Sequence, residues 1–263
     1  GRMASGMVGQ GRLPEVRDLL GAARRTLGRE WGALRDRHVV VTAGGTREAI
    51  DPVRFITNRS SGKQGYAIAQ AAIDSGARVT LIAVPNELPV PYGVELISVE
   101  SAEEMLEAVL AHSAEADALI MAAAVADYRP ERAAEQKLKK TGKELQLTLV
   151  PTADILATVG ARRLETGKPH VLVGFAAETR DLLKNARSKL EKKHADYIVA
   201  NDVSQAGAGF GVDTNIVTIL SADGSTLSLP QQTKSAVAEA IVQRVAARLQ
   251  TVPRRHEAES DEG

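Results

Sequence analysis

The sequence predicts an α/β fold: a Rossmann-like three-layer αβα sandwich with a mostly parallel sheet, plus a C-terminal β-hairpin that we interpret as a dimerisation element. Two observations predict it. From His38 onward, short runs rich in β-branched residues alternate with amphipathic segments of helical spacing, the pattern of consecutive βαβ units. A glycine turn, Gly44-Gly45, follows the first of these runs, where the backbone can turn tightly and approach a ligand.

The expected elements follow in chain order. Residues 14–35 carry leucines and alanines at helical spacing, which predicts one exposed helix. Predicted strands span residues 39–42, 79–83, 95–98, 118–121, 170–175 and 196–200. Predicted helices between them span residues 62–75, 101–112, 153–165 and 181–193. After Asn201, strands near 215–220 and 226–229 flank Asp223-Gly224, a dipeptide typical of hairpins, and a last helix spans 234–249.

Composition and length bound the class of protein. We divide the 263 residues into a leader and linker helix (1–37), one domain (38–250) and a charged tail (251–263) that we expect to be disordered. Lys+Arg and Asp+Glu are equal at 33 each, so net charge gives no reason to expect a nucleic-acid or membrane partner. The absence of cysteine excludes disulfides, thiolate zinc sites and a Cys nucleophile. No apolar run approaches the roughly 20 residues of a membrane span, so we expect a cytoplasmic protein.

Polar residues gather where the helix near residue 62 begins. Helix amino termini present free N–H groups and partial positive charge to anions, which predicts a phosphate-binding site. The simpler alternative, that Ser60 or Ser61 is only the helix N-cap, leaves Asn58 without a role. Neither a Gly-x-Gly-x-x-Gly fingerprint nor a Walker A loop is present. The residues expected at this site are Gly44, Gly45, Arg54, Asn58, Ser60, Ser61 and Gly62.

A run of alanines follows the strand at 118–121 and ends at Asp127. Such small side chains leave room for a flat ligand, such as a nucleobase, to lie against the backbone; tight strand-to-helix packing is the alternative. The carboxyl edge of an open α/β sheet is where ligands bind, so Asp127 is a candidate contact. Phe175, at the end of another strand, is interpreted either as a stacking residue or as part of the core.

Cationic residues are concentrated in two further segments. Residues 129–143 hold six basic residues and Gly142 with hardly any apolar anchor. The basic residues are Arg129, Arg132, Lys137, Lys139, Lys140 and Lys143. We favour a mobile basic flap that closes over phosphates, against a merely solvated surface. Lys189 and Lys193 lie four residues apart on a predicted helix and share one face. Asp154 is either the N-cap of its helix or a magnesium-linked carboxylate, and the sequence does not separate the two.

Five motifs occur together in order: residues 51–63, 122–129, 137–140, 174–179 and 200–203. Together they resemble bacterial phosphopantothenoylcysteine synthetase, the ligase half of a bifunctional coenzyme A biosynthesis protein, over residues 38–249. Residues 5–15 are similar to the end of the flavin-dependent decarboxylase that is fused upstream in that protein. The leader is therefore interpreted as a remnant of that domain, whose body is not in this chain, and no FMN is expected.

The resemblance implies a reaction. It would join 4′-phosphopantothenate to L-cysteine with CTP and Mg²⁺, through an acyl-cytidylate, releasing pyrophosphate and then CMP. The lysine pair is typical of CTP-using members, so CTP is expected rather than ATP. A homodimer is also implied, with elements of one subunit near the other's site, and a higher oligomer would form through the absent decarboxylase domain.

The resemblance also implies residue roles. Lys137 would stabilise charge while the intermediate forms, and Asn58 would hold the acyl group while cysteine attacks. The metal role of Asp154 is weakened because Thr152-Ala153 stands where many members have Asn-Pro. The implied CTP contacts are Met121, Ala122, Ala123, Asp127, Lys137, Ala153, Asp154, Ile155, Leu156, Phe175, Lys189 and Lys193.

Two other functions remain as alternatives. A short-chain-dehydrogenase-like oxidoreductase would bind NAD(P) on the same sheet, but it needs a Tyr-x-x-x-Lys, and none of the four tyrosines has a lysine four residues later. A non-catalytic nucleotide-binding module would use Lys137 and Asn58 only for affinity.

Overall fold

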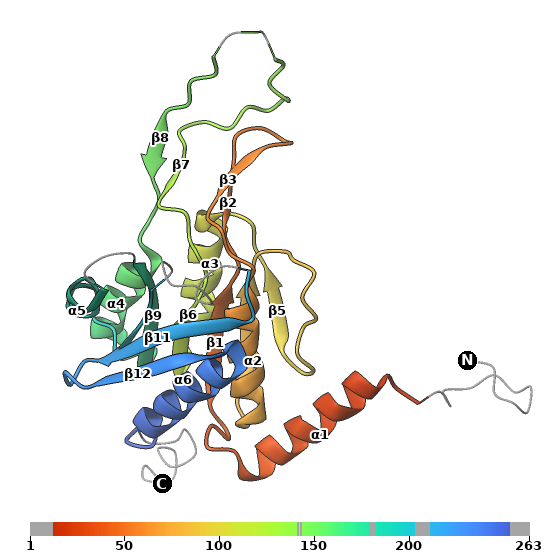
Figure 1. Cartoon of the computed structure of the whole chain (residues 1–263), viewed down its shortest axis with the longest axis vertical. Helices are drawn as coiled ribbons and strands as arrows, with labels where there is room; N and C mark the ends of the chain where they lie inside the picture. Colours follow the sequence, from red (N-terminus) through yellow and green to blue (C-terminus); the bar gives the residue numbers. More distant parts are fainter. Residues whose placement is uncertain (1–12, 141, 143, 179–181, 203–210, 253–263) are drawn as a thin grey trace, which may run out of the picture.

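An eight-stranded sheet organises the protein (Figure 1), with strand order β12-β11-β10-β9-β6-β1-β4-β5. The computed structural model describes residues 13–140, 142, 144–178, 182–202 and 211–252. At one edge, β11 pairs antiparallel with both β10 and β12, and all the other neighbouring strands pair in parallel. The strands are β1 (His38–Ala43), β4 (Arg78–Ala83), β5 (Glu95–Ser98), β6 (Ala118–Met121), β9 (Val171–Glu178), β10 (Tyr197–Asp202), β11 (Thr214–Ser221) and β12 (Thr226–Thr233).

Helices cover both faces of this sheet, as predicted. α2 (Lys63–Asp74) and α6 (Lys234–Leu249) pack on one face, where Val39 and Val41 of β1 point. α3 (Ala102–Ser113), α4 (Ile155–Thr166) and α5 (Leu182–Lys192) cover the other face, where Val40 points. Strand side chains alternate between faces, so one strand supplies both cores, and burying this apolar surface is the main stabilising contribution. The predicted αβα sandwich is confirmed.

Two short hairpins were not predicted. β2 (Arg47–Ala49) pairs with β3 (Phe55–Thr57), and β7 (Tyr128–Pro130) pairs with β8 (Leu149–Pro151). Strands of three residues, largely exposed, carry too little alternation to be recognised. The segment from β7 to β8, which we call the arm, projects from the body beside the β2–β3 hairpin (Figure 1). The basic run at residues 129–143, expected to be a mobile flap, therefore begins within a β-hairpin.

The ends of the chain follow the prediction where they are described. α1 (Val16–Trp31) is the expected exposed helix, and its inward face is narrow. A Cβ on Gly28 would lie 2.5 Å from the Asp74 carbonyl oxygen, so glycine permits the close contact with α2. The C-terminal hairpin continues the main sheet next to β10 rather than forming a separate unit. Residues 1–12 and 253–263 lie outside the described residues, so the disorder expected of the tail stays a prediction there.

The strand order reverses beside β1. From β1 the chain builds β4 and β5 on one side and then returns to place β6 on the other. The connection after β1 leads to α2 on one face of the sheet, and the connection after β6 leads to α4 on the other face. Ligands of such sheets bind at this point of the carboxyl edge. Gly44, the first residue after β1, has φ +90°, a conformation that favours glycine. None of the described helices is long and apolar enough to cross a membrane.

His38, at the start of β1, is buried without a complete set of partners. Its Nε2 lies 3.0 Å from Thr80 Oγ1, and Thr80 donates its own proton to Glu95. His38 Nε2 therefore carries the donated hydrogen, and the buried Nδ1 has no hydrogen-bond partner. Burial above all, together with the charge of Arg78, lowers the pKa of His38 to about 4, against the opposing effect of Asp117 and Glu95.

We expect this histidine to make the protein acid-sensitive. In the unfolded chain the pKa of His38 is 6.5, so below that pH the unfolded state takes up a proton while the folded state stays neutral down to about pH 4. Stability therefore falls as the pH falls through this window, by about 3 kcal/mol at pH 4. Urea unfolding at pH 7 and at pH 4 measures this loss. Between the two pH values, the free energy of unfolding should fall by about 3 kcal/mol less in His38→Gln than in the unmutated protein. The same loss in both proteins would contradict it.

Candidate functional site

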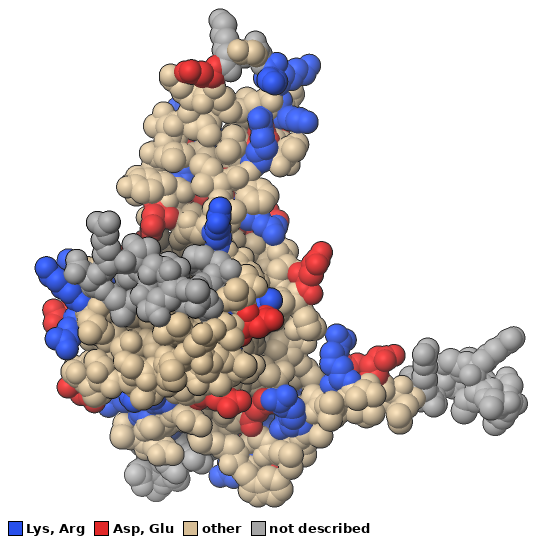
Figure 2. Space-filling view, in the orientation of Figure 1, with Lys and Arg blue, Asp and Glu red and all other residues tan. Residues whose placement is uncertain are grey.

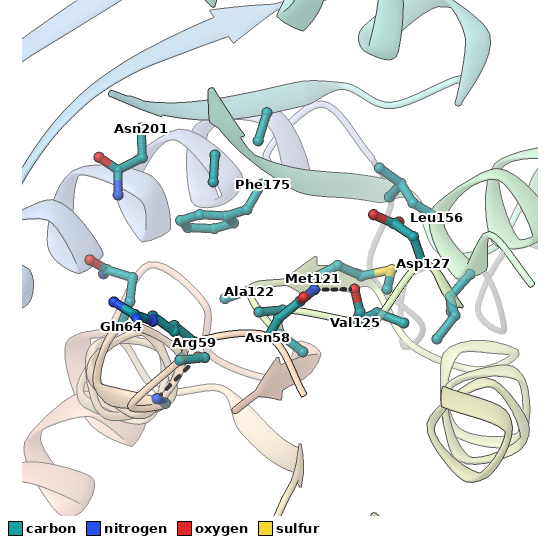
Figure 3. Close-up of a pocket in the computed structure, with 18 of the residues that line it drawn as sticks. Asn58, Arg59, Gln64, Met121, Ala122, Val125, Asp127, Leu156, Phe175 and Asn201 are labelled. Atoms are coloured by element: carbon teal, nitrogen blue, oxygen red, sulfur yellow. Dashed lines mark hydrogen bonds between the residues drawn. The ribbon is translucent and has the colours of Figure 1, made fainter. Parts of the chain in front are cut away.

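A cleft of about 730 Å³ opens at the carboxyl edge of the sheet, beside the point where the strand order reverses (Figure 3). One wall is the segment entering α2, the floor is the segment after β6, and the far side comes from β9, α4 and α5. Most of the predicted ligand residues meet here, although they are far apart in sequence. They are Asn58, Ser60, Ser61, Gly62, Met121, Ala122, Ala123, Asp127, Ala153, Asp154, Ile155, Leu156, Phe175, Lys189 and Lys193.

The entry to α2 is built by backbone rather than by a capping side chain. Gly62 is the N-cap, with φ +75°, and no side chain bonds to the free N–H groups of the first turn. Ser60 Oγ accepts instead from the Gly62 N–H at 3.3 Å. The alternative in which a serine is the N-cap is therefore wrong. The exposed N–H groups and the helix dipole give this wall affinity for anions.

The floor is held rigidly by hydroxyl groups of the β1 loop. Thr42 Oγ1 accepts from the Ala123 N–H at 3.1 Å, and Thr46 Oγ1 accepts from the Ala126 N–H at 2.9 Å. The Ala124 N–H donates to the Gly44 carbonyl at 2.8 Å. With short side chains along this segment, a planar group can lie against a fixed backbone.

Asn58 stands at the edge of that floor. Its Nδ2 donates to the Val125 carbonyl at 2.9 Å, a bond drawn in Figure 3, and the rest of the amide is exposed. An Asn amide has two donor hydrogens and an acceptor oxygen, so one hydrogen and the oxygen remain for a ligand. Asn58 also lines a second, adjoining cavity of about 320 Å³, to which the predicted Gly44 and Gly45 belong.

Asp154 and the lysine pair close the α4 side. Asp154 is the N-cap of α4, accepting from the Ala157 N–H at 2.9 Å, and it is ion-paired with Lys193. Burial raises the pKa of Asp154, but Lys193, the Ala157 N–H and the charge of Lys189 together lower it below its usual value. Both lysines line the cleft, as their spacing predicts. The described residues contain no group of three His, Cys, Asp or Glu that could hold a metal ion.

Phe175 faces the cavity between these walls (Figure 3). It is only partly buried and packs against the core beneath it. The two interpretations of this residue therefore combine: one side of the ring belongs to the core, and the other is available for stacking.

Two predicted residues, Arg54 and Lys137, line neither cavity. Arg54 belongs to the turn between β2 and β3, where it pairs with Asp51 at 2.5 Å and donates to the Leu138 carbonyl at 2.9 Å. Asp51 also accepts from the Leu138 N–H at 3.1 Å, and these bonds hold the pKa of Asp51 far below its usual range, the Arg54 bond most strongly. The arm is thus fastened to the β2–β3 hairpin.

The basic run lies along the arm and lines neither cavity. Lys and Arg side chains are spread along the arm in Figure 2, above the body of the protein. The exposed cations there include Arg129, Arg132, Lys137, Lys139 and Lys140, while Lys143 lies outside the described residues. The expectation of a mobile basic flap that closes over phosphates stays a prediction, since the structure shows only that Arg54 and Asp51 fasten the arm to the β2–β3 hairpin.

Several cleft residues carried no sequence signal. Arg59, Gln64, Asn215 and Lys234 join Asn201 at the α2 and α6 side of the cavity. Asn201 belongs to the motif at residues 200–203, but the spacing of that motif gave it no role. Gln64 and Lys234 read only as first-turn helix residues, and their approach depends on how α2 packs against α6.

Comparison with known proteins identifies the family. Residues 34–249 match the family described as DNA/pantothenate metabolism flavoprotein C-terminal domain. The chain belongs to this family. It is 49% identical to the coenzyme A biosynthesis bifunctional protein CoaBC of Bacillus subtilis (strain 168), over 94% of this chain and 60% of that protein. The chain thus spans about three fifths of the length of the curated relatives that it matches.

Solved members of the family share the fold. The crystal structure of the C-terminal domain of CoaBC is 42% identical, with a TM-score of 0.71, and the match covers 84% of this chain and 99% of that one. The DNA/pantothenate metabolism flavoprotein from Streptococcus pneumoniae is 25% identical, with a TM-score of 0.66, over 80% of this chain and 99% of that one. The family resemblance inferred from the five motifs is confirmed.

The capping role of Asp154 can be separated from a metal role. Asp154→Ala removes the N-cap and should lower the free energy of unfolding by about 1 kcal/mol, whereas Asp154→Asn caps nearly as well and should lower it much less. Urea unfolding of the two variants measures this. If magnesium titrations of activity show that both variants need equally more Mg²⁺ while their stabilities are unchanged, the residue is a metal ligand rather than a cap.

Proposed function

We propose that this chain is a phosphopantothenate–cysteine ligase of coenzyme A biosynthesis, which uses CTP to join 4′-phosphopantothenate to L-cysteine. The family of the chain and the names of its relatives support a role in coenzyme A biosynthesis. The observation that carries the proposal is the cleft itself, which gathers an anion-binding helix start, an alanine floor, an aromatic ring and two lysines. Its volume of about 730 Å³ suits two small substrates lying together.

In the first step, a carboxylate oxygen of phosphopantothenate attacks the α-phosphorus of CTP. The bond from that phosphorus to the bridging oxygen breaks, and pyrophosphate leaves with the electron pair. The base would lie against residues 121–123, beside Phe175, with Asp127 as a polar contact. Lys189 and Lys193 would neutralise the phosphates, since protonated lysines stabilise the charge that develops in such transfers.

In the second step, the cysteine amine attacks the acyl carbon. The carbon–oxygen bond to the nucleotide breaks, CMP leaves with the electron pair, and the new amide nitrogen loses one proton. The free Nδ2 hydrogen of Asn58 would donate to the acyl oxygen, because the other hydrogen already binds Val125. This keeps the carbonyl oriented toward the incoming amine.

Magnesium fits this site as a partner of the nucleotide. Mg²⁺ is usually held by one or two carboxylates together with substrate phosphates, and it neutralises the charge of the triphosphate. Asp127 and Asp154 are the carboxylates that line the cleft. Because Asp154 already binds Lys193 and caps α4, we propose that it contributes at most one oxygen.

Lys137 must come from another chain if it acts in this cleft, because its own arm is fastened elsewhere. We propose a homodimer in which the arm of one subunit reaches the cleft of the other. Such exchange is natural in a twofold dimer, since each subunit gives and receives the same element. We further propose a cytoplasmic location and no nucleic-acid partner.

The two steps should respond differently to mutation. Lys137→Ala should slow pyrophosphate release by about 100-fold or more, because a charge-stabilising contact is lost. Asn58→Ala should form the acyl-cytidylate but slow its reaction with cysteine. Single-turnover mass spectrometry with CTP, Mg²⁺ and 4′-phosphopantothenate, with and without cysteine, measures both, and exposed Lys139→Ala is the matched control. No intermediate in the unmutated protein would refute the ligase; equal pyrophosphate release from ATP would refute only the choice of CTP.

Mixed dimers test whether the arm acts across the subunits. Neither variant, Lys137→Ala nor Asn58→Ala, should turn over alone. If the arm acts in trans, a heterodimer of the two has one intact site, so a one-to-one mixture refolded together should recover about a quarter of the unmutated activity. An arm that acts on its own cleft predicts no recovery, which would overturn this arrangement.

A further inference from the structure

The cleft holds two separate groups of cations. Lys189 and Lys193 lie on the α5 side, where the proposed function places the nucleotide phosphates. Lys63 and Lys234 lie on the opposite side, at the first residues of α2 and α6. The nucleotide does not need both groups, so the second group has an anion of its own to bind.

Lys234 is the unusual member of this second group. It is only 7% exposed, yet it lines the cleft, and its Nζ donates to the Val212 carbonyl at 2.5 Å. Lys63, in contrast, is ion-paired with the exposed Asp213 at 2.6 Å. Burial first, and then the charge of Lys63, lowers the pKa of Lys234. An anion beside Lys234 would offset both effects.

The wall around Lys234 is fixed by two amide side chains, one on α2 and one on β11. Gln64 Nε2, on α2, donates to the Lys234 carbonyl at 3.1 Å. Asn215 Nδ2, on β11, donates to Gln64 Oε1 at 3.4 Å, and the Ile216 N–H donates to Asn215 Oδ1 at 3.2 Å. This chain of bonds fixes the backbone of Lys234, and the Val212 carbonyl holds its ammonium group.

Asn201 completes this end of the cleft. It lies on β10 beside Phe175, and Figure 3 shows its amide nitrogen turned toward Gln64 across the cavity. Its Oδ1 is buried and has no hydrogen-bond partner. The amide also carries an N–H₂ group, a donor separate from this oxygen, which faces the cavity and can bind a ligand oxygen. We call Asn201 and Lys234, with the wall formed by Gln64 and Asn215, the α6 subsite.

We propose that the α6 subsite binds the carboxylate of the incoming cysteine. The inference rests on the proposed function, in which four anionic groups enter the cleft. They are the nucleotide triphosphate, the phosphate of phosphopantothenate, its reacting carboxylate, which becomes the acyl group at Asn58, and the carboxylate of cysteine. The first lies on the α5 side and the second at the entry to α2. One ammonium and one amide donor match the two oxygens of a carboxylate and are too few for a triphosphate.

This position also orients the nucleophile. The amine and the carboxylate of cysteine are attached to the same carbon atom, so fixing the carboxylate at Lys234 leaves the amine directed into the cleft. Asn58, where the proposed function places the acyl group, lines the same cavity at the entry to α2 (Figure 3). The subsite would therefore select α-amino acids over simple amines, because only they carry the anchoring carboxylate.

Cysteamine, which is cysteine without the carboxylate, is the probe for this subsite. In steady-state assays with CTP and phosphopantothenate, Lys234→Met should lower kcat/KM for cysteine roughly tenfold or more, the size expected for a lost hydrogen bond to a charged group. The value for cysteamine should change less than twofold. Asn201→Asp, which keeps the shape but adds a negative charge, should likewise impair cysteine and spare cysteamine. Exposed Lys192→Met is the matched control.

Pyrophosphate release without cysteine separates the remaining outcomes. If the variants release it at the unmutated rate and lose preference for cysteine over cysteamine, the subsite is supported. Equal losses with cysteine and cysteamine overturn it, and slower pyrophosphate release in the variants assigns the anion to a phosphate instead. If the unmutated protein forms no acyl-cytidylate, the proposed function fails before the subsite is tested. Thermal melting of each variant checks that it is folded.

Discussion

The structure depends on the pairing of β1 with a parallel neighbour on each side. All six residues of β1 are buried, and the strand is held by β4 on one side and β6 on the other. Because the chain leaves β1 for α2 on one face of the sheet and leaves β6 for α4 on the other, a cleft remains at the carboxyl edge between these connections. Thr42 and Thr46 then bind the segment after β6, so the same strand that opens the cleft also fixes its floor.

Charge is segregated around this cleft although the chain as a whole is neutral. Cations occur at its two ends, on α5 and at the starts of α2 and α6, while others are carried outward on the arm. The Asp51–Arg54 pair determines where the cations of the arm lie, because it binds both the N–H and the carbonyl group of Leu138. A local ion pair thus fastens the arm that carries these cations to the β2–β3 hairpin.

Long, periodic segments were predictable because burial imposes a period on the sequence. Valines of β1 alternate between the two cores, and the helices repeat apolar residues at helical spacing, so most strands and helices were placed within a few residues. The β2–β3 and β7–β8 hairpins were missed because their stability comes from specific polar bonds, such as those of Asp51, and not from burial of an alternating face. The residues that follow each strand could be located because the same periodic pattern shows where the strand ends.

By itself, the sequence determined the mostly parallel sheet between two layers of helices, and it predicted a ligand site formed by Asn58, Asp127, Lys189 and Lys193. Only the tertiary structure decided which residues complete that site. Gln64, Asn215 and Lys234 meet because α2 packs against α6 beside the antiparallel edge of the sheet, and no spacing along the chain encodes that contact. It likewise moved Arg54 and Lys137 out of the cleft, because hydrogen bonds between hairpins distant in sequence depend on the folded backbone.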